Sequence, residues 1–279
     1  MITRENIIER LEKKYPQYSF IPTEVTKNGD VHLQAISVRS NTSLAPTIYT
    51  ESIIARCEDN LEQAVEIICN IIDQHKAPDI DVNMLTDRNF LLSGIRVGVQ
   101  KESDEILVKH AVNDFPGMEA YLYVTSQGNN EMWSVKIKPE ILTRANIPED
   151  EAWQVAEKHT YEATTLQSMA EVLAEMMGDS YDKCLDDVVN CEMYVISNRE
   201  KCKGAASILN RALLQSFAKE HNCDALCVLP SSLHEAILVP LQGEYHIEDF
   251  NAMVCEINET QVAPEDVLVN RAYIIRFDE

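Results

Sequence analysis

The stretch DALCVLPSSLHEAILV (residues 224–239) decides the fold class. Its two apolar runs are short and are separated by a proline and two serines, a pattern typical of two strands joined by a turn. We expect these strands over 224–229 and 235–239, with amphipathic helices before and after them over 205–221 and 247–258. Because strands and helices are mixed along the chain, the sequence predicts an α+β fold with antiparallel hairpins.

A first hairpin is expected near the N-terminus. It joins segment 17–26 to segment 31–39 through Asn28 and Gly29, residue types that adopt the positive φ angles of a tight turn. Pro22 lies in the first of these strands, and a proline lacks the N–H group that a central strand needs. This strand is therefore predicted to lie at a sheet edge.

The spacing of apolar residues also predicts helices outside the C-terminal part. Apolar side chains recur at intervals of three, four and seven between 60 and 75, which indicates one amphipathic helix. A helical piece is expected near 102–110 and another helix over 165–177. Between them, segments 118–126 and 131–137 have the composition of a second hairpin.

A polar segment over 178–190 separates the last of these helices from the next apolar strand. We place a soft domain boundary there. The expected organisation is an N-terminal α+β lobe over 1–180 and a C-terminal lobe of α/β type over 181–279. The two lobes are expected to be loosely separable, with one continuous domain as the alternative.

The chain is strongly acidic. Its 279 residues include 24 Lys and Arg against 46 Asp and Glu, which gives a net charge of −22. Such a charge repels the phosphates of nucleic acids and anionic membrane surfaces, so neither is an expected direct partner. The charge is compatible with a solubilising surface, with a surface for another protein, and with imitation of the charge of a nucleic acid.

The N-terminal residues lack the apolar run of a signal peptide, and no later stretch approaches about 18 consecutive apolar residues. We therefore expect a cytoplasmic protein. The eight cysteines are scattered through apolar segments of a chain much larger than a disulfide-rich scaffold. They are expected to be reduced thiols that pack as small apolar side chains.

Four motifs carry a resemblance to a known family. They are MYVISN (193–198), GAA (204–206), LPSSLHE (229–235) and INETQVAPEDVL (257–268). On these motifs the chain resembles the bacterial domain-of-unknown-function family 5688 over nearly its whole length. The resemblance implies a bacterial origin and an uncharacterised protein, with no established reaction, cofactor or catalytic residue. The chain departs from the family after residue 209, where relatives read Tyr-Pro-Gly, and this departure favours a continuous helix over 205–221.

The LPSSLHE motif contains the candidate site. In an extended segment Ser232 and His234 project to one face with their Cα atoms about 7 Å apart, so a hydroxyl and an imidazole could meet if the chain bends. Glu235 would point to the opposite face and could orient His234 only through a turn. Ser231, Ser232 and His234 are candidate binding residues as well. The structural alternative is turn chemistry, in which the hydroxyls satisfy nearby backbone groups.

Metal and nucleotide sites lack complete patterns. His221, Cys223 and Cys227 are close in sequence, with Cys202 as a conceivable fourth ligand, but Cys227 lies in a predicted buried strand. Leu238 occupies the position where a His-Glu-x-x-His zinc motif needs its second histidine. No glycine-rich phosphate loop is present in the sequence. We therefore expect neither a metal nor a cofactor.

These observations favour a non-catalytic protein that binds another macromolecule in an accessory or regulatory role. The first alternative is a hydrolase that uses Ser232 and His234. The second is an acidic mimic of nucleic acid. The sequence does not specify a small-molecule ligand.

Overall fold

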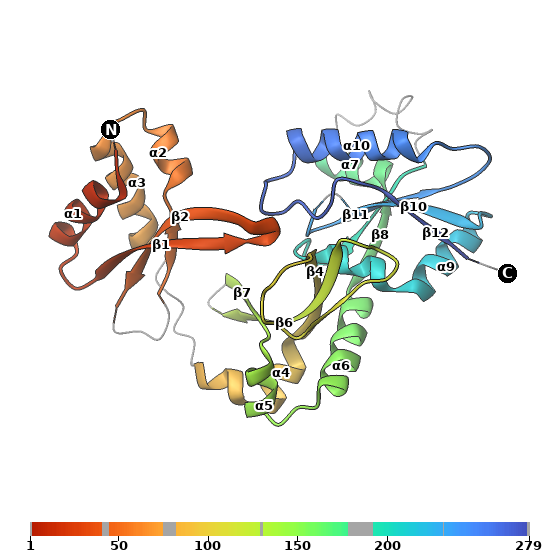
Figure 1. Cartoon of the computed structure of the whole chain (residues 1–279), viewed down its shortest axis with the longest axis horizontal. Coiled ribbons are helices and arrows are strands. Elements are labelled where there is room, and N and C mark those ends of the chain that lie inside the picture. Colours follow the sequence, from red (N-terminus) through yellow and green to blue (C-terminus); the bar gives the residue numbers. More distant parts are fainter. Residues whose placement is uncertain are drawn as a thin grey trace.

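The computed structural model describes residues 2–40, 45–74, 82–128, 131–177, 192–230 and 232–277. Residues 2–74 form one part, here called the N-terminal module, and residues 82–277 form the body, which contains two further sheets (Figure 1). Every strand pair in these sheets is antiparallel, and helices pack against the strands. The predicted α+β class is confirmed.

The N-terminal module is a three-stranded sheet in the order β1-β2-β3 with helices on one face. Apolar side chains such as Leu11, Ile36 and Ile68 form its own core, whose described buried residues lie between Ile2 and Cys69. The predicted hairpin is confirmed, and Pro22 lies in an edge strand as expected. The elements are α1 (Arg4–Lys14), β1 (Ser19–Lys27), η1 (Asn28–Asp30), β2 (Val31–Arg39), β3 (Thr47–Tyr49), α2 (Glu51–Arg56) and α3 (Leu61–Gln74).

The first half of the body is built around the long strand β6. Strand β4 pairs with one side of β6, and β5 and then β7 pair with its other side. Helix α6 packs against β4 (Figure 1). The elements are η2 (Val82–Thr86), α4 (Arg88–Gly94), β4 (Ile95–Lys101), β5 (Lys109–Ala111), β6 (Met118–Gly128), β7 (Glu131–Lys136), α5 (Pro139–Arg144) and α6 (Glu149–Glu162).

The second half of the body is a five-stranded sheet in the order β12-β10-β11-β9-β8. Strand β10 is buried on both faces, because Leu226 and Val228 join the main core while Ala225 and Cys227 face α10. This explains its continuous apolar run. The elements are β8 (Thr164–Ser168), α7 (Met169–Met177), β9 (Tyr194–Asn198), η4 (Gly204–Leu209), α9 (Arg211–Glu220), β10 (Ala225–Leu229), β11 (Ala236–Pro240), α10 (Ile247–Thr260) and β12 (Tyr273–Arg276).

One apolar core joins the two sheets of the body. It includes Leu122 from β6, Ile196 from β9 and Ile275 from β12. The boundary predicted at residue 180 falls within 178–191, outside the described residues, and the division into lobes at that point stays a prediction. No helix within the described ranges has both the length and the apolar character needed to cross a lipid bilayer.

Three predicted helices are corrected by the structure. Segment 102–110 is a loop followed by β5, because the Glu105 carboxylate accepts from Gln100 of β4 and the Ser103 hydroxyl donates to Glu119 of β6. The first residues of 165–177 form β8, which pairs with β9 before α7 begins. The helix over 205–221 is divided into η4 and α9 at Asn210, whose side chain accepts a hydrogen bond from Leu213 N at 3.1 Å and so begins a new helix.

Candidate functional site

One face of the β4-β6 pair carries a guanidinium and two tyrosine rings. Successive residues of a strand point to opposite faces, so Val97 enters the core while Arg96 and Gly98 face the other way. Arg96 lies opposite Tyr123, and Gly98 lies opposite Tyr121. A Cβ at Gly98 would lie 2.6 Å from Cζ of Tyr121, which shows that this ring covers the glycine. The sheet therefore presents a polar and aromatic surface at this point.

A tight turn over 198–203, directly after β9, faces this surface. The Asn198 side chain closes the turn, because its Oδ1 accepts from Cys202 N at 3.1 Å and its Nδ2 donates to Cys202 O at 2.7 Å. Lys201 and Lys203 both have a left-handed backbone, with φ of 50° and 54°. The turn thus fixes the direction in which the Lys203 side chain leaves the backbone.

Gly204 allows three segments to meet behind this turn. A Cβ at this position would lie 2.4 Å from Ser197 Oγ, 2.5 Å from Asn198 N and 2.7 Å from His234 O. The Ser197 hydroxyl donates to His234 O at 2.7 Å. No side chain fits between these groups, so the close approach of β9 and the turn before β11 requires a glycine.

His234 connects this cluster to the C-terminal segment. Its Nδ1 accepts from Lys203 N at 3.3 Å, and its Nε2 lies 3.5 Å from Oδ2 of Asp266. An Nδ1 that accepts a hydrogen bond assigns the ring proton to Nε2, which faces the Asp266 carboxylate. The imidazole therefore positions the backbone of Lys203. The four motifs that carry the family resemblance all contribute to this cluster.

The structure also shows where the Ser232 hydroxyl is directed. Its Oγ accepts from His234 N at 3.1 Å and from Glu235 N at 3.3 Å, and the residue is 8% exposed. This is the turn chemistry that the sequence offered as the structural alternative. Glu235 is exposed, and Ser231 lies outside the described residues. A catalytic or binding role of Ser232, His234 and Glu235 stays a prediction.

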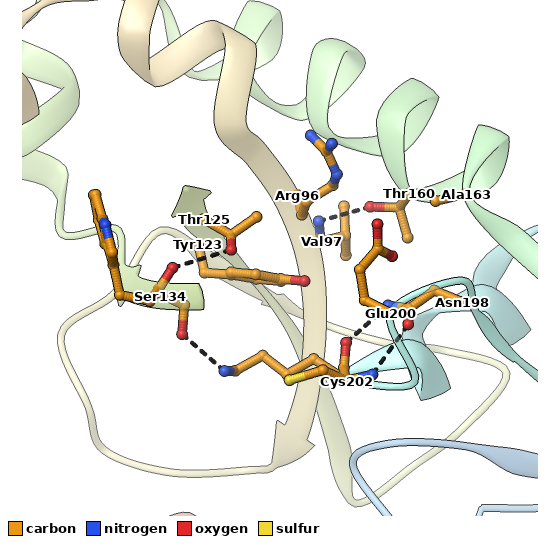
Figure 2. Close-up of a pocket in the computed structure, with 12 residues that line it drawn as sticks. Arg96, Val97, Tyr123, Thr125, Ser134, Thr160, Ala163, Asn198, Glu200 and Cys202 are labelled. Carbon is orange, nitrogen blue, oxygen red and sulfur yellow. Dashed lines mark hydrogen bonds between the residues drawn. The ribbon is translucent and has the colours of Figure 1, made fainter. Parts of the chain in front are cut away.

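The polar face of the β4-β6 pair and the 198–203 turn enclose a pocket of about 180 Å³, here called the Tyr123 pocket (Figure 2). Thr160 of α6 closes one side, where its Oγ1 accepts from Val97 N at 2.9 Å. The residues that line the pocket are Arg96, Val97, Tyr123, Thr125, Trp133, Ser134, Thr160, Ala163, Asn198, Glu200, Cys202 and Lys203.

Lys203 forms no ion pair with any of the carboxylates that the structure describes. Its Nζ donates to Ser134 Oγ at 2.9 Å and lies 5.3 Å from the centre of the Tyr123 ring. Across the described residues, no carboxylate lies within 4.0 Å of this ammonium group. Burial lowers the pKa of Lys203 and is the largest effect on it; the charges of Lys136 and Lys27 also lower this pKa, whereas Cys202 and Asp266 raise it.

Arg96 and Tyr123 offer further donors to the pocket. The Arg96 guanidinium donates to the neighbouring carbonyl of Ile95 at 2.9 Å, and within the described ranges it also has no carboxylate partner. The Tyr123 side chain is 6% exposed, and no hydrogen bond to its hydroxyl is found in the described part of the chain. Burial raises the pKa of this hydroxyl, so it remains a donor over the whole neutral range. Glu200 is an exposed residue whose carboxylate also lines the pocket, where it is directed toward Val97 and Thr160 (Figure 2). Its charge contributes to the raised pKa of the Tyr123 hydroxyl.

Of the residues that suggested soft metal ligands, His221 and Cys223 have other hydrogen-bond partners and Cys227 is buried. Nδ1 of His221 lies 2.9 Å from Phe217 O, and Nε2 lies 2.9 Å from the Tyr194 hydroxyl. Cys227 is buried in β10. Within the ranges that the structure describes, no group of three His, Cys, Asp or Glu side chains has an arrangement suited to a metal ion.

Sequence reasoning missed Arg96, Tyr123 and Lys203. The signal for the first two is the alternation in IRVGVQK (95–101) and MEAYLYV (118–124), which places polar and aromatic residues on one face of each strand. No sequence pattern points to Lys203. Its position depends on the 198–203 turn, and the residues that close this turn follow neither a helical nor a strand period.

Comparison with known families tests the resemblance that the four motifs carry. Residues 3–276 match the Family of unknown function (DUF5688). The chain belongs to this family. The resemblance noted in the sequence is therefore confirmed. No curated protein and no solved structure matches the chain. Membership of DUF5688 assigns no activity, so a function has to be argued from the pocket itself.

Proposed function

We propose that this DUF5688 member is a non-catalytic, cytoplasmic bacterial protein that binds a partner protein by receiving one of its anionic side chains in the Tyr123 pocket. The observation that carries this proposal is the pair of cations, Arg96 and Lys203, which line one small pocket together with Glu200 and form no ion pair with a carboxylate among the described residues.

Unpaired cations at one site are informative in a chain with a net charge of −22. Two lysines of the β4-β6 sheet have carboxylate partners, since Lys109 Nζ lies 2.9 Å from Glu119 and Lys136 Nζ lies 2.5 Å from Glu105, whereas Lys101 forms no ion pair among the described residues. Taking a cation out of water without an opposite charge is unfavourable, and a bound anion would remove this cost. The Tyr123 hydroxyl would add a neutral donor to the same anion.

The size of the pocket favours a side chain over a cofactor. Sites for small molecules and cofactors usually have volumes of about 300–1,000 Å³, whereas the Tyr123 pocket has about 180 Å³. One carboxylate or phosphate group with a short stem fits this volume. A partner protein that inserts an acidic or phosphorylated side chain is therefore the best-supported occupant.

The arrangement of the LPSSLHE turn supports a binding role over hydrolysis. A serine nucleophile needs its hydroxyl next to a base. Here the Ser232 hydroxyl accepts hydrogen bonds from two backbone N–H groups, and the His234 imidazole faces Lys203 N and Asp266. Through these contacts the LPSSLHE motif positions the wall of the Tyr123 pocket.

A fluorescence titration tests the proposal. The chain has two tryptophans, and Trp133 lines the pocket; in a Trp153→Phe background its emission reports binding. N-acetyl-O-phosphoserine amide and N-acetylglutamate amide serve as probes, with N-acetylserine amide as the uncharged control. We expect a saturable change with one or both anionic probes and none with the control.

The matched variants are Lys203→Met and Lys201→Met in the same background. Both lysines lie in one turn with left-handed backbone, but Lys201 points to Glu175, with Nζ at 3.6 Å from its carboxylate. A hydrogen bond to a charged group contributes about 1.5–3 kcal/mol, so Lys203→Met should weaken binding roughly tenfold or more, and Lys201→Met should have little effect. Equal affinity in both variants, or no response to either anion, would refute the proposal.

A further inference from the structure

A second cavity of the body, with a volume of about 490 Å³, is lined by residues of helix α6, strand β5 and the segments η4 and α9. Helix α6 contributes three side chains to it, those of Trp153, Glu157 and Tyr161. Their spacing of four residues places them next to one another along one face of the helix. We call this space the Trp153 cavity. Its volume lies in the range of about 300–1,000 Å³ that is usual for small-molecule sites.

The walls of the Trp153 cavity are largely aromatic and apolar. The centre of the Trp153 ring lies 4.4 Å from that of the His110 ring, with an angle of 46° between the two planes. Tyr161 and the buried Phe115 add two further rings to the lining, and the aliphatic side chain of Ile208 is buried beside the same cavity. Aromatic rings attract cations over their faces. The lining therefore favours a ligand that is both apolar and positively charged.

The charged side chains of the lining point to the same sign of ligand. Arg211 Nη1 donates to Asp114 Oδ2 at 2.7 Å, so these two charges compensate each other. Glu157 is half-buried, and the described part of the chain gives its carboxylate neither an ion pair nor a hydrogen bond. Partial removal of a carboxylate from water is unfavourable unless a cation accompanies it. A bound cation would supply the missing partner of Glu157.

We propose that the Trp153 cavity binds a small molecule that carries a methylated ammonium group, with Trp153 and Tyr161 against its methyl groups and Glu157 as its counter-charge. A bare ammonium group has three N–H donors that each need an acceptor, whereas a quaternary ammonium group has none and is recognised mainly by aromatic rings. The apolar walls therefore favour the methylated form. The inference does not depend on the proposed function, because the charged residues of the Trp153 cavity are not those of the Tyr123 pocket.

Choline is the probe for this site, and its uncharged analogue with carbon in place of nitrogen is the matched control. The chain has two tryptophans, so in a Trp133→Phe background the emission of Trp153 reports binding. We expect a saturable change with choline and an affinity for the uncharged analogue that is roughly tenfold lower or less. N-acetyl-trimethyllysine amide presents the same group as a protein side chain would. Stronger binding of this lysine derivative than of choline would overturn the assignment to a small molecule.

Two glutamates of α6 provide matched variants. Glu162 lies outside the cavity lining and pairs with Lys158 at 3.9 Å. Glu157→Gln should weaken choline binding roughly tenfold because it removes the counter-charge, and Glu162→Gln should have little effect. Tyr161→Leu keeps the charge of Glu157 but removes a ring, so it should weaken choline binding as well.

The methyl protons of choline give a second readout that needs no tryptophan substitution. In the wild-type chain their NMR signal should move upfield on binding, because they would lie over aromatic rings, and this shift should be smaller in Tyr161→Leu. Three results would each overturn the inference: no binding of choline by either readout, equal affinity for choline and its uncharged analogue, or equal affinity in Glu157→Gln and Glu162→Gln.

Discussion

The ammonium group of Lys203 lies over the ring of Tyr123 in the same way that Lys136 lies over Tyr121, with 5.3 Å from nitrogen to ring centre in each pair. The two pairs differ in charge compensation. Lys136 forms an ion pair with Glu105 at 2.5 Å, whereas Lys203 donates to the Ser134 hydroxyl. A cation above an aromatic ring gains about 0.5–2 kcal/mol, which is less than the cost of full desolvation. The geometry thus leaves Lys203 ready to receive an anion.

Anion binding should depend on pH through Lys203. Burial lowers the pKa of Lys203 below the ordinary lysine value, so its cation is present below that folded pKa and is lost as pH rises through it. The affinity for N-acetyl-O-phosphoserine amide should therefore fall between neutral pH and about 10, while Arg96 keeps its charge and maintains weak binding. Titrations of Trp133 fluorescence at several pH values check this. In Lys203→Met the decrease should be absent; the same decrease in that variant would contradict the assignment.

Alkylation of cysteines should report occupancy of the pocket. Cys202 lines the Tyr123 pocket and is partly exposed, and Cys255 is partly exposed at a site that is not part of the pocket. Iodoacetamide at pH 8 should modify both, and the bound probe should slow modification of Cys202 alone. Burial raises the pKa of Cys227 to about 12, so this thiol should stay unmodified in the folded protein. Peptide mapping by mass spectrometry measures all three. Equal protection of Cys202 and Cys255 would indicate a global effect of the probe rather than binding in the pocket.

Gly204→Ala should destabilise the body. The added Cβ would approach two backbone atoms, Asn198 N and His234 O, within 2.7 Å, and backbone atoms cannot move aside as a flexible side chain can. We expect a loss of about 3 kcal/mol in the free energy of unfolding, at the upper end of the usual cost of overpacking. Gly243→Ala is the control, because nothing lies within 4 Å of its Cβ and the positive φ of 73° costs about 1 kcal/mol. Urea denaturation compares the two. Equal losses of stability in the two variants would show that the backbone around Gly204 can move to accommodate a Cβ.

Ser232→Ala separates the structural role of this hydroxyl from a catalytic one. The substitution leaves His234 N and Glu235 N without their acceptor, which should cost about 1–3 kcal/mol of stability. A fluorophosphonate probe should not label the folded wild-type protein. Labelling that disappears in Ser232→Ala would instead support the hydrolase hypothesis.

Much of the fold could be predicted from the sequence, because burial imposes a period on each element. The hairpin around Asn28 and the helix near Ile68 follow from turn chemistry and apolar spacing, and the structure confirms both. Helix interruptions could not be predicted in this way. Asn210 ends one helical segment and begins the next by a local hydrogen bond, although the apolar pattern continues across it.

The candidate site could be predicted in part. The motifs identified Asn198, Gly204 and His234 as one family signature, and the structure shows that they form one contact cluster. The sequence did not reveal Arg96 or Lys203, because they are distant along the chain and meet only when two sheets share one core. Charged residues that meet only through tertiary contacts form no recognisable pattern in the local sequence.

The most direct test of the central claim is to measure the pKa of Lys203 itself. The NMR shift of its Cε carbon can be titrated with and without N-acetyl-O-phosphoserine amide. We predict that the pKa lies below the ordinary lysine value of about 10.4 in the free protein and rises when the probe binds, because an adjacent anion stabilises the ammonium form. A pKa that does not change at saturating probe concentration would show that Lys203 does not contact the anion, and would contradict the account.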